Sequence, residues 1–308
     1  MGYLVVRTGV EALLEPLRTL SWWLLPVVLV PYLAATLLHT LGWRLAFARE
    51  RPPFARLVSI RLAGEAFNVT TGSVGGEPLK VLLLRPRVPL DGAVAAVVID
   101  KTTIAMGQGA FLLVGLVIAR AGFALPPAFV ETMTALFVVE ILALLALALV
   151  QTSEGIGRAL QRLARSAWPA LGQRLEPFLR IERMVAVFYR HHAGRLGGAI
   201  VWHLLGWVAG SLEVYLVLSW LGLDVSLATA LVIEAFASAV RFLAFMVPAA
   251  LGALEAGTMV VFGAFGLSPG LGLSVTLIRR LRQIVWVVIG LLTLAALRHP
   301  PDRPGGPR

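Results

Sequence analysis

Long apolar stretches dominate the chain, and two of them are interrupted near their centres. Five stretches are continuous over about 20 residues or more, the length that an α-helix needs to cross a bilayer. These are Trp22–Trp43, Val94–Ala119, Phe129–Val150, Leu196–Leu221 and Leu271–Leu297. The stretches 57–85 and 226–267 are also apolar, but Gly or Pro and charged residues break them. The pattern predicts an all-α, polytopic integral membrane protein.

The two broken stretches share a pattern of charged residues around a break. In the first stretch Glu65 and Asn68 precede the break at Gly75-Gly76, and Glu77 and Lys80 follow it. In the second, Glu234 and Arg241 precede a break between Pro248 and Gly252, and Glu255 follows. Paired broken segments in the two halves of a membrane protein are typical of a transporter's binding site.

Arginine predicts the orientation, because cytoplasmic loops carry an excess of Lys and Arg. Arginines gather at 44–61, at 85–87 and at 158–195, whereas the links 122–127, 222–226 and 267–270 carry almost no positive charge. The arginine-rich segments and the C-terminus are therefore expected in the cytoplasm. The first broken stretch would then leave and re-enter on the cytoplasmic side, and the second on the outer side.

This reasoning predicts two re-entrant helical hairpins in an inverted repeat. The alternative is that each broken stretch forms two short helices that both cross the bilayer. We expect a single membrane domain over 1–298, with a first half at about 22–120, a connector at 126–195 and a second half at 196–297. Residues 1–20 have the pattern of an interfacial amphipathic helix, and 299–308 that of a disordered tail.

Composition narrows the class of protein. Hydrophobic residues make up 58% of the 308 residues and charged residues 14%, with a mean hydropathy of +0.84 and a net charge of +10. No basic patch alternates with aromatic residues in a polar segment, so nucleic acid is not an expected partner. The chain has no cysteine, and no catalytic or metal-binding motif occurs. We therefore expect neither an enzyme nor a cofactor or metal site.

The candidate binding residues are the charged, polar and hinge positions of the broken stretches and the spans beside them. Arg61, Glu65 and Asn68 share one helical face, and Glu234 and Arg241, seven residues apart, are positioned to form an ion pair. Mutual pairing of these groups, with no ligand, is the alternative explanation. The full set is Glu65, Asn68, Gly75, Gly76, Glu77, Lys80, Asp100, Glu213, Glu234, Arg241, Pro248, Gly252, Glu255, Arg279, Arg280 and Arg282.

Packing explains one further pattern on the fourth continuous span. Gly206 and Gly210 form a small-xxx-small motif, which favours close contact between helices. Glu213 on the same span is expected to be a buried partner for an arginine.

The combined pattern resembles the flippase-like family, the transmembrane part of lysylphosphatidylglycerol synthases, and within it the stand-alone HpnL-type proteins associated with hopanoid biosynthesis. The residues that carry the resemblance are Gly64-Glu65 with Asn68, Gly75-Gly76-Glu77, Asp100, Leu212-Glu213-Val214, Glu234 with Arg241, Val247-Pro248 with Gly252 and Glu255, and Arg279-Arg280-Leu281-Arg282. It implies a lipid flippase or lipid transporter of the bacterial inner membrane, with a polar-headed membrane lipid as its substrate and a hopanoid or other terpenoid lipid as a candidate. The alternative is a non-transporting scaffold. Candidate protein partners are a second copy of the chain or enzymes of lipid synthesis.

Overall fold

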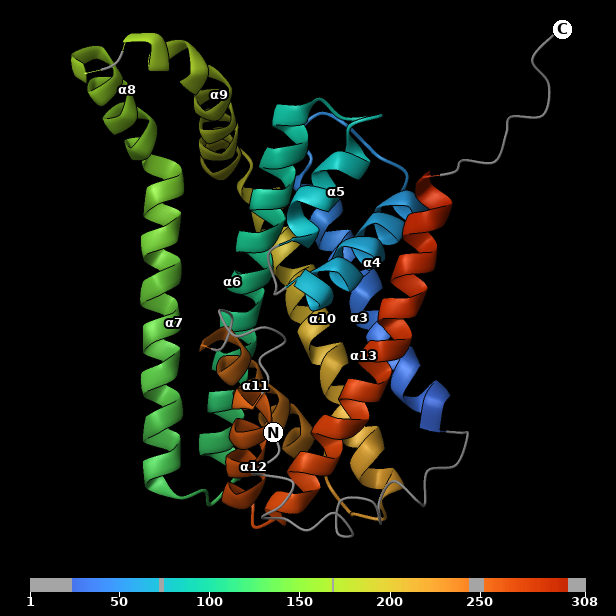
Figure 1. Cartoon of the computed structure of the whole chain (residues 1–308). Coiled ribbons are helices and arrows are strands. Elements are labelled where there is room, and N and C mark those ends of the chain that lie inside the picture. Colours follow the sequence, from blue (N-terminus) through green and yellow to red (C-terminus); the bar gives the residue numbers. More distant parts are fainter. Residues whose placement is uncertain (1–23, 72–74, 168, 244–251, 299–308) are drawn as a thin grey trace, which may run out of the picture.

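The protein is an elongated bundle of helices, seen here in a computed structural model that describes residues 24–71, 75–167, 169–243 and 252–298 (Figure 1). All the regular elements among these residues are α-helices, which agrees with the predicted all-α class. They are α3 (Leu24–Ala46), α4 (Phe54–Thr71), α5 (Gly76–Leu84), α6 (Leu90–Gly122), α7 (Pro127–Ser153), α8 (Gly155–Ala167), α9 (Pro169–His191), α10 (Ala193–Trp220), α11 (Leu227–Leu243), α12 (Ala253–Ala264) and α13 (Pro269–Arg298).

Four of these helices are long and apolar enough to cross a membrane: α6, α7, α10 and α13. They contain three of the five predicted spans in full and a fourth, Leu196–Leu221, up to its last residue. The first predicted span, Trp22–Trp43, overlaps α3, and its first two residues lie outside the described part of the chain. The expected interfacial helix at 1–20, the tail at 299–308 and Pro248 also lie outside it.

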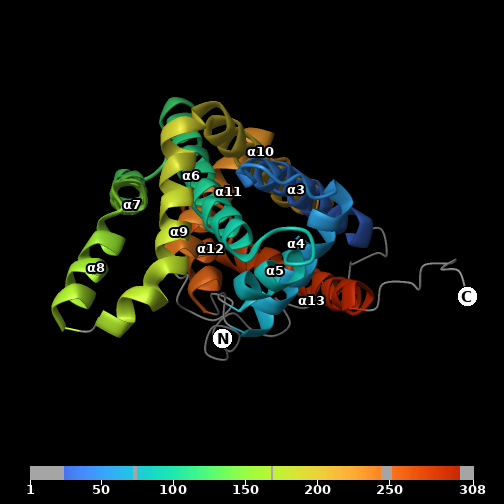
Figure 2. The ribbon, with the colours of Figure 1, turned by 90° about the horizontal axis from the view of Figure 1, so that it is seen from above.

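The broken stretches form two helix pairs at different heights of the bundle. The first becomes α4 and α5, which lie in the upper half of Figure 1. The second becomes α11 and α12, which lie in the lower half. Seen from above, α13 and α7 stand towards opposite sides of the bundle (Figure 2). α8 and α9 form an arm at the upper end beside α7.

Helix α6 passes through two separate hydrophobic cores. Its residues Ala93–Ile99 pack in the upper core with Trp43 of α3 and Leu57 of α4. Its residues Phe111–Ala119 pack in the lower core with Phe236 of α11. Between them α6 carries its buried polar residues, namely Asp100, Thr102, Thr103 and Gln108. A polar layer therefore separates two apolar cores near the middle of the bundle.

Candidate functional site

The contact between α3 and α10 is built from a short sequence that occurs twice. His-x-Leu-Gly-Trp spans 39–43 on α3 and 203–207 on α10. A Cβ added to Gly206 would lie 2.6 Å from Cε1 of the His39 ring, and a Cβ added to Gly42 would lie 2.7 Å from Cε1 of the His203 ring. Each histidine therefore packs against the glycine of the other copy, and the two Nδ1 atoms are 3.1 Å apart.

The two helices run antiparallel along this contact. Arg195, near the start of α10, donates a hydrogen bond of 3.1 Å to the carbonyl of Ala48, just beyond the end of α3. The reciprocal contact has the form of a local two-fold relation, in which i meets j and j meets i. Close packing was predicted at Gly206, and the structure confirms it. The repeated motif itself was missed, although both copies are visible in the sequence.

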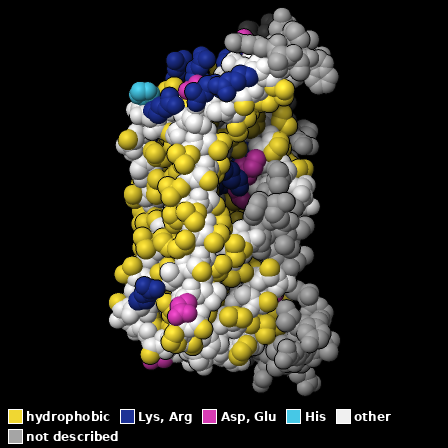
Figure 3. All heavy atoms as spheres, turned by 90° about the vertical axis from the view of Figure 1, so that its left-hand side faces the viewer, with side chains coloured by type: hydrophobic (Ala, Val, Ile, Leu, Met, Phe, Trp, Pro, Cys, Tyr) yellow, Lys and Arg dark blue, Asp and Glu magenta, His cyan; other side chains and the backbone are white. Residues whose placement is uncertain are grey.

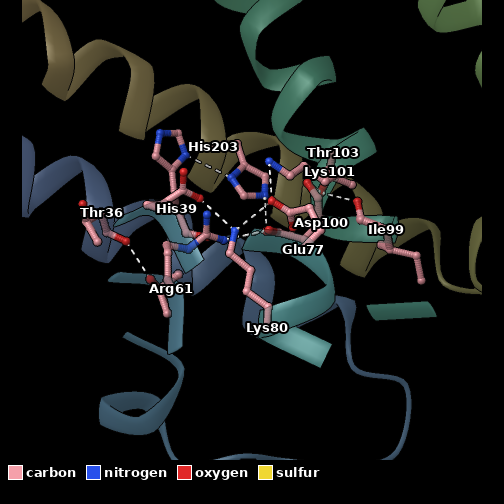
Figure 4. Close-up of polar contacts among 12 residues, drawn as sticks. Thr36, His39, Arg61, Glu77, Lys80, Ile99, Asp100, Lys101, Thr103 and His203 are labelled. Carbon is pink, nitrogen blue, oxygen red and sulfur yellow. Dashed lines mark hydrogen bonds and ion pairs between the residues drawn. The ribbon is translucent and has the colours of Figure 1, made fainter. Parts of the chain in front are cut away.

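In the upper half of the polar layer, a cluster of ion pairs joins α4, α5 and α6 (Figure 4). Arg61 of α4 donates to both carboxylate oxygens of Asp100 of α6, at 2.7 and 2.9 Å. The same guanidinium donates to the His39 carbonyl at 3.1 Å. Nε2 of His203 lies 3.5 Å from Oδ1 of Asp100. The contact between His39 and His203, which we call the histidine seam, therefore lies directly beside the Arg61–Asp100 ion pair.

Lys80 is the centre of this upper cluster. Its Nζ lies 2.8 Å from Glu65 Oε1 and 3.3 Å from Glu77 Oε1, and the lysine is fully buried. Lys101 of α6 also reaches Glu77 Oε1, at 2.8 Å. The Trp43 ring faces both Arg61 and Lys80, with distances of 5.2 and 5.9 Å from the cations to the ring centroid, which favours keeping positive charge there.

Asn68 ties α4 to the first turn of α5. Its Oδ1 accepts a hydrogen bond of 2.8 Å from the Gly76 backbone N–H, and its Nδ2 donates to Glu77 Oε1 at 3.0 Å. A Cβ added to Gly64 would lie 2.5 Å from Lys80 Cε. Gly64 and Gly76 thus allow α4 and α5 to approach closely. The predicted ligand contact of Gly75 and Gly76 stays a prediction.

In the lower half, the acidic groups of α10, α11 and α12 meet arginines of α13. Glu234 lies between two arginines, with Arg241 at 2.5 Å from its Oε1 and Arg279 at 2.5 Å from its Oε2. Glu213 contacts Arg282, and its Oε2 lies 3.6 Å from Nε of Arg279. The predicted Glu234–Arg241 pair and the predicted arginine partner of Glu213 are both confirmed.

Glu255 differs from Glu77, although both lie in the first turn of a helix after a break. Both oxygens of Glu255 are engaged: Oε1 accepts from Arg280 at 2.9 Å and Oε2 from the Gly252 backbone N–H at 2.8 Å. It is fully buried, and its carboxylate satisfies the backbone N–H of the N-cap residue Gly252 at the start of α12. Oε2 of Glu77, in contrast, is buried without a hydrogen-bond partner among the described residues.

Trp207 links the upper and lower clusters. Its ring meets the His39 ring edge-on, with centroids 5.7 Å apart, and Arg241 lies 5.7 Å from the Trp207 centroid. Trp43 and Trp207, the last residues of the two motif copies, therefore face cations of the upper and lower cluster respectively. The contacts form one polar layer across the bundle.

The charges of this layer do not balance when histidines are counted as neutral. The basic members are Arg61, Lys80, Lys101, Arg241, Arg279, Arg280 and Arg282, and the acidic members are Glu65, Glu77, Asp100, Glu213, Glu234 and Glu255. Among the described residues, one positive charge is in excess. The segments 72–74 and 244–251, which lie at the breaks, contain no ionisable side chain that could offset it.

A few charged side chains of the layer reach the surface. The side chains of Lys101, Glu65 and Arg241 are 44%, 36% and 29% exposed, whereas Lys80 and Glu255 are fully buried. Figure 3 shows charged side chains at mid-height of a largely apolar face, further charged side chains near its lower end, and a gathering of Lys and Arg at the upper end. The layer thus has an exposed edge and a buried, self-paired interior.

Most of the residues predicted for the site lie in the charged layer. Fifteen of the sixteen predicted residues are described, and those with charged side chains all join one of the two clusters. Lys101, Trp43 and Trp207 were not among them. His39 and His203 were also absent from the set.

Comparison with known proteins gives one match. The sequence profile of the lysylphosphatidylglycerol synthase TM region matches residues 1–291. No curated protein and no solved structure matches the chain.

Proposed function

Because the chain belongs to the family of the lysylphosphatidylglycerol synthase TM region, we propose that it is a lipid flippase or lipid transporter of the bacterial inner membrane. It would move a polar-headed lipid between leaflets without changing a covalent bond. The observation that carries this proposal is the charged layer at mid-height of an apolar bundle. Ionised groups at membrane depth are costly and mark substrate pathways.

The exposed edge of the layer is the proposed contact for the head group. Lys101, Glu65 and Arg241 are the members with the most exposed charge, and they lie on α6, α4 and α11. A lipid could hold its head group there while its tail stays in the bilayer. The buried Lys80 and Glu255 would position these contacts.

The excess positive charge favours an anionic head group, such as a phosphodiester. A single negative charge would neutralise the layer, and guanidinium groups bind phosphate oxygens strongly. The resemblance to the HpnL-type proteins further suggests a hopanoid or other terpenoid tail. Head group and tail are separate parts of the proposal and can be tested separately.

The proposed topology is an inverted repeat with α4–α5 and α11–α12 as re-entrant hairpins. Three observations support it. The antiparallel motif copies on α3 and α10 pack reciprocally, and Glu-Ala-Phe occurs at 65–67 on α4 and again at 234–236 on α11. The two helix pairs also lie in opposite halves of the bundle (Figure 1). The arginine-rich upper end would face the cytoplasm.

Leaflet exchange in proteoliposomes tests the proposal. Purified protein is reconstituted with tail-labelled fluorescent phosphatidylglycerol or phosphatidylcholine, and a membrane-impermeant reductant then quenches the outer leaflet. We expect faster exchange of the anionic probe than in protein-free vesicles. Lys101→Gln and Arg241→Gln should each weaken head-group binding about 10- to 100-fold, because each removes one charge-assisted hydrogen bond.

Arg190→Gln is the matched control, because Arg190 pairs with Glu154 on the exposed surface of the α8–α9 arm. It should leave exchange unchanged. A non-transporting scaffold makes the opposite prediction: no exchange by the wild type and no effect of either site variant on partner binding. Exchange by correctly folded site variants at the wild-type rate would overturn the proposed site.

A further inference from the structure

Helix α7 carries a carboxyl group that the charged layer does not use. Glu140 is 1% exposed, and both of its oxygens are buried without a hydrogen-bond partner among the described residues. It lies at the midpoint of the 27-residue helix, about 20 Å along the axis from either end. If α7 spans the bilayer, Glu140 therefore lies near the midplane.

The surroundings of Glu140 are apolar. The buried residues of α7 form one helical stripe of Phe129, Met133, Glu140 and Leu144, and Leu136 and Phe137 on the same side also pack against the lower core. Opposite the carboxyl group is Gly109 of α6, where an added Cβ would lie 3.8 Å from Glu140 Oε1. The carboxyl group therefore lies at van der Waals distance from the glycine in the contact between α6 and α7, beside the side chains of Ile141 and Leu144.

Several charged groups on the helices packed against α7 have partners other than Glu140. These helices are α6, α8, α9 and α11. Their engaged groups are Asp91 with Arg180, Asp100 with Arg61, Lys101 with Glu77, Arg120 with Thr134, Arg190 with Glu154, Glu182 with the Gly157 backbone, and Glu234 with Arg241. Among the described residues, no cation therefore contacts Glu140 to compensate a negative charge there.

An ionised carboxylate in such a site costs far more than a neutral acid. Binding a proton removes that cost, and losing the proton drives the group towards water or a cation. Helix α7 can respond, because only 17% of its apolar span is buried in the bundle. Protonation would therefore favour the closed contact between α6 and α7, and ionisation would favour opening it.

We propose that Glu140 is a proton-binding site and that its protonation couples lipid movement to a proton gradient. The coupling rests on the proposed translocation, whereas the proton site does not. The ligand is a proton, which adds to one carboxylate oxygen to give the neutral acid. Such a site would give the transporter an energy source independent of nucleotides.

An apolar carbodiimide detects the proton site directly. Dicyclohexylcarbodiimide adds to a protonated carboxyl group to give an O-acylisourea, which rearranges to a stable N-acylurea with no leaving group. We expect a mass-shifted Glu140 peptide in mildly acidic buffer and much less of it in mildly alkaline buffer. Glu140→Gln should abolish the adduct at that position. Glu131→Gln, which removes an exposed carboxyl group on the same helix, should leave the adduct unchanged.

Coupling is then measured as the response of leaflet exchange to an imposed pH gradient, in the wild type, Glu140→Gln and Glu131→Gln. We expect the gradient to shift exchange in the wild type and Glu131→Gln, and to have no effect in Glu140→Gln. Absence of a pH-dependent adduct at Glu140 would overturn the proton site. An adduct without any exchange would contradict translocation alone, and exchange that ignores the gradient would contradict coupling alone.

Discussion

At the scale of single residues, Arg279 is more buried and has more carboxylate partners than Arg241, although both pair with Glu234. Arg279 is 9% exposed and lies near two carboxylates, whereas Arg241 is 29% exposed and lies near one. Removing one partner of a buried pair leaves an uncompensated charge, at a cost of about 3–5 kcal/mol. The cost of a partly exposed partner is lower, because water replaces part of the lost interaction.

We therefore predict that Arg279→Gln lowers the melting temperature in detergent more than Arg241→Gln does. Adding Glu234→Gln to Arg241→Gln should lower the melting temperature further, because Arg279 then loses the carboxylate oxygen 2.5 Å away. Arg190→Gln, at an exposed pair, should change stability by less than about 1 kcal/mol. Thermal unfolding of the four variants measures the order. Equal shifts for Arg279→Gln and Arg241→Gln would contradict the assignment of Glu234 to two unequal partners.

Residue spacing predicted some of these contacts and could not predict others. Glu234 and Arg241 lie on one helix, so a spacing of seven residues places them on one face. Glu213 and Arg282 are 69 residues apart, and His39 and His203 are 164 apart. Such contacts depend on how the helices pack, which local periodicity does not determine. Whether Glu140 has a partner also depends on how the helices pack, so its position in an apolar span could not predict that it lacks one among the described residues.

At the scale of elements, the glycines of α10 have unequal roles. Gly206 faces the His39 ring, whereas an added Cβ at Gly197 meets nothing within 4 Å. Replacing a helical glycine by alanine stabilises a helix by up to about 1 kcal/mol when the new methyl group has space. Where the methyl group meets a packed ring, the strain of overpacking is about 1–3 kcal/mol.

Gly206→Ala should accordingly destabilise the protein, and Gly197→Ala should be neutral or stabilising. Combining Gly206→Ala with His39→Ala should remove the clash between the methyl group and the ring. Thermal unfolding in detergent is the measurement. A Gly206→Ala variant as stable as Gly197→Ala would mean that α3 and α10 do not pack as closely as described.

The element boundaries follow from sequence more closely than the pairing of elements does. Apolar length located α6, α7, α10 and α13, and the breaks at Gly75-Gly76 and before Gly252 separated α4 from α5 and α11 from α12. The seam between α3 and α10 was not predicted. The sequence signal for this contact is the five-residue motif that occurs on both helices. An analysis of the periodicity within one helix does not detect such a repeat.

At the scale of the whole molecule, the unequal charge of the two ends predicts the orientation in the membrane. Arg49 lies in the link from α3 to α4, and Asp224 in the link from α10 to α11; both side chains are exposed. The cysteine-free chain allows single cysteines to be placed at these positions. A membrane-impermeant maleimide should label Asp224→Cys in intact spheroplasts and Arg49→Cys only after permeabilisation.

The reverse labelling pattern would overturn the proposed orientation. Labelling of both cysteines from the same side of the membrane would contradict the placement of the two links on opposite sides. Gly72, just before the break at Gly75-Gly76, and Leu251, between Pro248 and Gly252, lie outside the described residues. The same reagent at these positions tests whether the hairpins open to opposite sides.

The reciprocal histidine–glycine contact also limits how the two halves of the bundle can move. Each ring sits in the notch left by a glycine on the other helix, so sliding α3 along α10 would lift both rings from their notches together. Tilting one helix about the crossing point leaves both rings seated. The seam therefore resists shear and permits hinge rotation, with its axis through the pair of imidazoles.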